Sequence, residues 1–411
     1  MKLAKLSLAA ITVASLSASA FAADSLAGMF KNGKASGQLK AYYYSKDNGT
    51  QSDGLFTTGA VLNFNTAVFN GFSGALTFQG NSSPFATSGA KSLYNSTEYG
   101  TGAQISQAYL QYANSGFFAK AGRQYVSTPL VAGSGSRMTK ESFEGYVLGY
   151  TGLPQTVIAA GYVDKYQHRT DKDGNIGSFK DDLTGLGNDD GAWTIFAINK
   201  SIPGLKLTGA YAEVNKGNDK TLGAVDIWYG DVNYHVPMNG FTLRTGVNYY
   251  DTQADNTNAT TGVDTNTYSL MLGANMNGLD AQIAYGENDD KTDGTPYMYG
   301  LGNGTGLLYN NTVDSLYVND QSAGMSNLGI KVGYDLSKVG VAGTKVGIGY
   351  NDFSGAKDTT IKDYTVIGGY ASYKFSGSLK GLSALAQYEG KDSDDDSKDG
   401  YRFRFKAIYS F

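Results

Sequence analysis

The sequence predicts an all-β protein: a single transmembrane antiparallel β-barrel of about 18 strands with short periplasmic turns and long external loops. Three observations predict this fold class. Apolar and polar residues alternate through most of the chain, short and long connections follow one another, and the chain begins with an export signal. A mean hydropathy of -0.30 fits, because barrel strands carry polar and apolar side chains in turn.

The first residues have the pattern of a secretory signal peptide. Lys2 and Lys5 are followed by the mostly apolar run Leu6 to Leu16, and Ala20-Phe21-Ala22 fits the small-x-small cleavage rule. The apolar run is shorter than the roughly 20 residues that span a bilayer as a helix. We therefore expect residues 1–22 to be removed and residues 23–411 to form one porin domain in a Gram-negative outer membrane.

Composition supports a long strand-rich unit. The chain has 55 Gly, 31 Tyr and 19 Phe but only 6 Pro, and it has no Cys, so disulfides and thiolate chemistry are excluded. Period-two alternation predicts strands over Gly37 to Lys46, Phe56 to Val68, Phe72 to Asn81, Ala103 to Ala113, Gly116 to Tyr125, Ser142 to Tyr150, Gln155 to Lys165, Ala192 to Lys200, Leu205 to Val214, Val225 to Val236, Phe241 to Asp251, Thr265 to Met276, Leu279 to Glu287, Asn327 to Leu336, Thr344 to Phe353, Asp363 to Phe375, Leu379 to Gly390 and Asp399 to Phe411.

The connections between these segments alternate in length. Tight turns such as Asn70-Gly71, Asn239-Gly240 and Asn277-Gly278 alternate with longer polar stretches, about eight turns and about nine loops in all. An outer-membrane barrel requires this alternation, because one rim carries tight periplasmic hairpins and the other carries external loops. A sandwich or a propeller has no reason to alternate in this way.

The final strand shows the two faces most clearly. Tyr401, Phe403 and Phe405 share one face, which would meet lipid, and the basic side chains between them share the other. A terminal strand that ends on Phe411 is also similar to the signal that barrel-assembly machinery reads. We further expect contact with outer-membrane lipid and lipopolysaccharide, passage of small-molecule solutes, a monomer or homotrimer, and no cofactor or metal.

The face opposite the lipid collects basic residues, which predicts a lumen that favours anionic solutes. The alternative is that these cations only solvate the wall or pair with carboxylates. The alternation is poor over Ala192 to Lys200 and Val225 to Val236, so the facing of these strands stays open. The predicted pore-lining basic residues are Lys40, Lys120, Lys206, Arg244, Lys331, Lys345, Arg402, Arg404 and Lys406.

A barrel of this width needs narrowing by loops that fold inward. The third long loop, Ser127 to Glu141, and the seventh, Asn288 to Ser326, are the candidates, because apolar residues in a polar loop indicate packing. In the seventh loop these are Leu307-Leu308 and Leu316-Tyr317-Val318. The predicted constriction residues of the third loop are Pro129, Leu130, Ser136, Arg137 and Glu141.

The third loop resembles that of the OprD family of substrate-selective outer-membrane porins. The resemblance lies in Thr128-Pro129-Leu130 and in the run from Ser136-Arg137 to Phe143-Glu144-Gly145, and a second one lies in Tyr229 to Pro237. It implies an 18-strand barrel, a constriction made by loops three and seven, and a ladder of basic side chains that leads carboxylates through. Family ladders are rich in arginine, whereas lysines fill many of these positions, which implies looser recognition of carboxylates.

Other classes of function fit less well. A net charge of -4 argues against nucleic-acid binding. An enzyme would need a constellation around His168 or His235, and neither stands in one. A calcium loop from Asp171 to Asp182 lacks its glycine, which is replaced by Ile176. A non-selective general porin and a structural or adhesive barrel without an open pore remain as alternatives.

Overall fold

The computed structural model describes residues 23–95, 98–171, 173–181, 183, 190–215, 224–254, 263–290, 299–313 and 322–411. The predicted signal peptide, residues 1–22, lies outside this part of the chain. The same holds for Asp182 of the calcium template and for Leu316-Tyr317-Val318 of the seventh loop.

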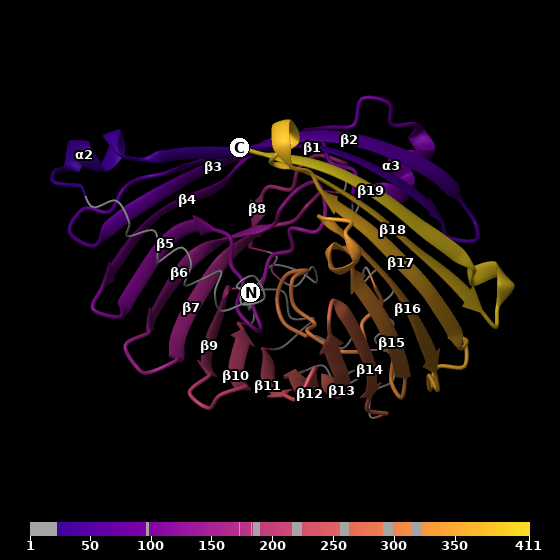
Figure 1. Ribbon diagram of the computed structural model, residues 1–411. Helices are drawn as coiled ribbons and strands as arrows, with labels where there is room; N and C mark the ends of the chain where they lie inside the picture. The colour runs from indigo at the N-terminus through magenta and orange to yellow at the C-terminus, as the bar shows by residue number, and fades with distance from the viewer. Residues whose placement is uncertain are drawn as a thin grey trace.

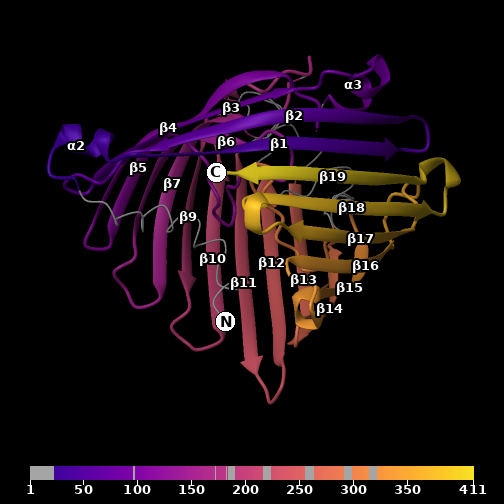
Figure 2. The same cartoon turned by 45° about the horizontal axis from the view of Figure 1, so that its top comes forward.

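The chain forms one antiparallel sheet that closes on itself. The first strand pairs with the last over Gln38 to Asp47, and Figure 2 shows β1 and β19 side by side. The strands of the wall are β1 (Lys34–Asp47), β2 (Ser52–Asn65), β3 (Phe72–Ser82), β4 (Gly102–Asn114), β5 (Phe117–Gln124), β6 (Ser142–Tyr150), β7 (Thr156–Gln167), β9 (Ala192–Asn199), β10 (Leu205–Val214), β11 (Val225–Pro237), β12 (Thr242–Ala254), β13 (Val263–Met276), β14 (Leu279–Asn288), β15 (Ser326–Asp335), β16 (Thr344–Ser354), β17 (Tyr364–Lys374), β18 (Leu382–Ser393) and β19 (Gly400–Ser410).

The predicted fold class is confirmed as a closed 18-strand barrel with one extra strand. Every predicted strand is present; Ser142–Tyr150 and Leu205–Val214 have the predicted bounds, whereas β2 begins and ends a few residues earlier than predicted. The short elements were not predicted, because neither a helical nor a strand period can be read in so few residues. They are β8 (Phe179–Lys180), α2 (Leu26–Lys31), α3 (Ser88–Tyr94), η1 (Leu336–Val339), η2 (Gly377–Leu379) and η3 (Asp396–Lys398).

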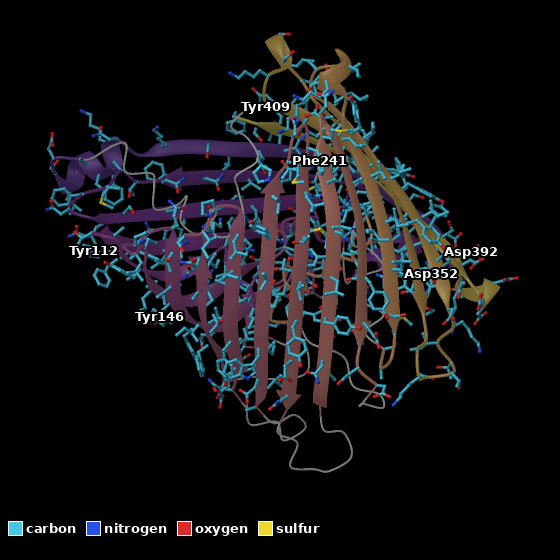
Figure 3. The ribbon with its side chains drawn as sticks, turned by 60° about the horizontal axis from the view of Figure 1, so that its bottom comes forward. Tyr112, Tyr146, Phe241, Asp352, Asp392 and Tyr409 are labelled. Carbon is cyan, nitrogen blue, oxygen red and sulfur yellow. The ribbon has the colours of Figure 1, made fainter. Side chains whose placement is uncertain are left out.

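The wall has an apolar outer face and a polar inner face. In β19, Arg404 and Lys406 are buried on the inside, whereas Phe405 between them is 40% exposed on the outside. Figure 3 shows Tyr112 and Tyr146 projecting from the outside of the wall. Among the described residues, no helix is long and apolar enough to cross a membrane.

The two strands of uncertain facing have apolar residues on both sides. In β9, Thr194 and Phe196 point inward while Trp193 and Ile195 are exposed, and in β11 Ile227 is fully buried. These inner faces belong to a hydrophobic cluster that also contains loop residues. Alternation is weak there because inward-folded loops, rather than water, cover the inner side.

Candidate functional site

The described parts of three long loops meet inside the barrel: L3 (residues 125–141, between β5 and β6), L4 (residues 168–191, between β7 and β9) and L7 (residues 289–325, between β14 and β15). Figure 1 shows loop segments of L3 and L7 within the ring of strands. L3 and L7 join through their backbones: Leu301 N donates to Leu130 O at 2.8 Å, and Ala132 N donates to Leu301 O at 2.9 Å. Leu130, Val131 and Leu301 are buried, so an apolar contact surrounds these hydrogen bonds.

The three loops share one buried carboxylate. Glu141, at the end of L3, is 0% exposed. Its Oε1 accepts a hydrogen bond from Asn303 Nδ2 of L7 at 2.6 Å and forms an ion pair with Arg169 Nε of L4 at 2.9 Å. Its Oε2 accepts from Ser134 N at 2.7 Å and Asn303 N at 3.3 Å. A buried charge is costly without such partners, so the assembled loops compensate the carboxylate of Glu141.

Arg137, the motif arginine of L3, is neutralised by another loop. Its Nε forms a 2.8 Å ion pair with Glu98 Oε1, and its Nη1 donates to Ser136 Oγ at 3.1 Å. Both charged side chains are about nine-tenths buried. Arg137 therefore anchors L3 beside α3.

Basic side chains of β1 and β19 hold the tip of L3. Lys40 Nζ donates to Met138 O at 3.2 Å, and Lys406 Nζ donates to Ser136 O at 2.6 Å. Arg404 reaches the same Ser136 carbonyl at 3.3 Å. Carbonyl oxygens carry no net charge, so these bonds position the lysines without cancelling their charge. With the inward neighbours on the same two strands, they form what we call the basic column: Lys40, Lys46, Arg402, Arg404 and Lys406.

The other predicted basic residues also lie at inward positions, but several have acidic partners on the wall. Lys206 Nζ lies 3.1 Å from Asp231 Oδ2, and Arg244 Nη2 lies 2.7 Å from Asp280 Oδ1. Lys331 interacts electrostatically with Glu389. Lys345, at the turn end of β16, lies 3.9 Å from Asp335 and is 62% exposed. An inward position in a strand therefore does not by itself leave a basic side chain without an acidic partner.

A cavity of about 240 Å³ lies between L3 and the inner wall formed by β4 to β9. Lys120 Nζ lies 3.7 Å from the Tyr109 ring centroid, and Lys140 Nζ lies 4.0 Å from the Tyr125 centroid. Burial lowers the pKa of Lys140 and raises the pKa of Tyr125 to about 12, so the tyrosine stays neutral. We call this the lysine–tyrosine cavity; its apolar lining includes Val131, Val163 and Phe196.

A later part of L7, the wall segment (residues 307–313), lies across the inner faces of β12 to β17. Wall amides donate to its backbone: Asn248 Nδ2 to Leu307 O at 2.6 Å and Asn351 Nδ2 to Asn310 O at 2.6 Å. Glycines make room for its side chains. A Cβ at Gly286 would lie 2.5 Å from Asn310 Nδ2, and a Cβ at Gly349 would lie 2.6 Å from Val313 Cγ2. Close approach of the loop to the wall depends on these glycines.

Sequence reasoning missed several residues of this site. Lys46 has the same parity as Lys40 and lies within the predicted strand Gly37 to Lys46, so alternation was sufficient to place it on the inner face. Lys140 lies within the run from Ser136 to Gly145, but nothing in its local sequence marks it as a site residue. Glu98, Arg169 and Asn303 carry no local signal, because their partners lie far away in the sequence. In the part of the chain that the structure describes, no three His, Cys, Asp or Glu side chains gather as a metal site.

A closed barrel with an apolar exterior, a charged inner wall and loops folded into its interior defines an outer-membrane channel. The sequence profile described as "outer membrane porin, OprD family" matches residues 94–406. The chain belongs to this family and is an outer-membrane porin, a class of channels rather than enzymes. No curated protein matches the chain in sequence.

Solved structures share the fold at low sequence identity. OccK9 (OpdG) of Pseudomonas aeruginosa has a TM-score of 0.80 at 15% identity, with 93% of this chain and 99% of that chain covered. OccAB1 of Acinetobacter baumannii has a TM-score of 0.78 at 15% identity, covering 93% and 97%. OpdK of P. aeruginosa, solved with vanillate, has a TM-score of 0.73 at 14% identity, covering 93% and 99%.

Proposed function

We propose that this channel prefers anionic solutes and that small carboxylate-bearing molecules are its substrates. The observation that carries the proposal is the placement of Lys40 and Lys406, whose ammonium groups bind neutral carbonyl oxygens of L3 at the constriction. A narrow, low-dielectric passage focuses the field of such charges, which concentrates anions and repels cations.

The lysine–tyrosine cavity supports the same preference. Lys120 and Lys140 lie against tyrosine rings, which leaves their positive charge in place, and apolar side chains line the rest of the cavity. A carboxylate on a compact apolar body matches this pairing of cation and apolar wall. Vanillate, the compound in the OpdK structure, is a carboxylate of this kind.

Ion selectivity of the refolded protein in planar bilayers tests the proposal. Under a salt gradient, we expect a reversal potential that shows anions permeating faster than cations. Raising the salt from 0.1 to 1 M shortens the Debye length from about 10 Å to about 3 Å, so the preference should shrink. A cation-selective or non-selective open channel at low salt would overturn the proposal.

We also propose that β19 is the segment that barrel-assembly machinery recognises. Tyr409 near its end and Phe411 directly after it are exposed. Replacing Phe411 by Ala should lower the amount of folded protein in the outer membrane of cells. Unchanged assembly would count against this role, and refolding of the same variant in detergent separates recognition from stability.

A further inference from the structure

We infer that Glu141 is a positioning residue that locks L3, L4 and L7 in the constricted state, and that losing its bonds to Asn303 opens a second, wider conductance state. This inference concerns the width of the passage. It does not depend on the proposed preference for anions.

The connection between L3 and L7 centres on this one side chain. Asn303 supplies its backbone N–H and its side-chain amide to the two oxygens of Glu141. Three further hydrogen bonds join Leu130 and Ala132 to Leu301 and Gly304 through backbone atoms. Because hydrogen bonds to an ionised acceptor are the stronger ones, the carboxylate dominates the junction.

Arg169 brings L4 into the same arrangement. Its guanidinium is mostly buried and pairs with Glu141 at 2.9 Å. If Glu141 lost its charge, Arg169 would be left with a buried and weakly compensated charge, which is costly. The state with closed loops is therefore stabilised jointly by L3, L4 and L7, and it weakens as a unit.

L7 contains a glycine-rich joint at the place where such a release requires one. Gly302 and Gly306 have φ values of +83° and +76°, a region that suits glycine, and Gly304 lies between them. On one side of this joint Leu301 to Gly304 contact L3, and on the other side the wall segment is bonded to β12 to β16. The part of L7 that contacts L3 can therefore detach from L3 while the wall segment stays bound to the strands. This moves that part of L7 away from L3.

Single-channel recording of Glu141→Gln tests the inference. Glutamine keeps the size of the side chain but removes the charge and places a donor against Ser134 N or Asn303 Nδ2. We expect a second level of higher conductance, occupied for a roughly tenfold larger fraction of the time than in the wild type, as losing one charge-assisted hydrogen bond predicts. Asn303→Ala, which removes the side-chain donor of L7, should shift occupancy in the same direction.

Glu144→Gln is the matched control. Glu144 lies three positions after Glu141 and forms a 2.9 Å ion pair with Arg123, but it is bonded to neither L4 nor L7 in the described contacts. This variant should gate like the wild type. Equal changes in Glu141→Gln and Glu144→Gln would mean that any lost ion pair disturbs the pore, and the inference would fail.

A reversible cross-link gives the decisive test. The chain has no cysteine, and a Cβ at Gly304 would lie 3.0 Å from Ala132 Cβ, slightly inside the roughly 3.5 to 4.5 Å of a disulfide. In Glu141→Gln or Asn303→Ala, adding Ala132→Cys and Gly304→Cys should abolish the wider level under oxidation and restore it under reductant. A wider level that persists in the oxidised channel would overturn the inference, as would its absence from both parent variants.

Discussion

Basic side chains of equal parity differ in what they contact, and this decides what each can do. Lys206 and Arg244 face Asp231 and Asp280, whereas Lys40 and Lys406 face backbone carbonyls of L3. Alternation alone identified the inward face of β19. It could not identify these partners, because a contact between β19 and L3 spans most of the chain and leaves no periodic pattern.

Charge reversal in the basic column should reduce anion selectivity. In Arg404→Glu or Arg402→Glu, a carboxylate replaces a cation of the basic column, so the ratio of anion to cation permeability should fall toward unity or below in 0.1 M salt. Reversal potentials measure this ratio. Lys345→Glu, at the exposed turn end of β16, should have a smaller effect, and an equal effect at both places would contradict the role of the column.

At the scale of elements, local periodicity was sufficient to predict the strands of the wall but not the conformation of the loops. Most strands of the barrel are marked by alternation and by the turns that flank them, and β6 and β10 have their predicted bounds. The inward folding of L3 and L7 was expected from apolar residues such as Leu130 and Leu307. The path that these loops follow could not be predicted. It is determined by contacts with glycines and side-chain amides on strands that lie several hairpins away in the sequence.

Filling the glycine positions under L7 should displace its wall segment. The double variant Gly286→Val and Gly349→Val places methyl groups where Asn310 and Val313 now lie, within 2.5 to 2.6 Å of the new Cβ atoms. We expect an altered single-channel conductance with an intact barrel, measured by bilayer recording and by circular dichroism. Gly230→Val, at an exposed position with nothing within 4 Å, is the control and should conduct normally.

At the scale of the whole molecule, the barrel separates hydrocarbon from water with one layer of strands. The family match over residues 94–406 and the similar solved structures agree with what alternation and the connections predicted. Closure gives each of the 18 wall strands a partner on both sides, so the backbone of these strands is hydrogen-bonded within the membrane. The side chains then determine that the outer face contacts hydrocarbon and the inner face contacts water.

A lysine on the lipid face should destabilise the barrel in proportion to its depth. Phe405→Lys puts a charge near the middle of β19 and should cost roughly 2 to 4 kcal/mol, whereas Tyr409→Lys near the rim should cost roughly 0 to 1 kcal/mol. Equilibrium unfolding in lipid vesicles measures both. Equal costs would show that these residues do not lie at different depths in hydrocarbon.

The proposed function requires an open pore that admits anionic solutes faster than cationic ones. Liposome swelling with gluconate, glucose and glucosamine compares an anion, a neutral solute and a cation of nearly equal size. We predict that liposomes containing this protein admit gluconate fastest and glucosamine slowest. Equal rates for the three solutes, faster entry of glucosamine or no swelling at all would contradict the account.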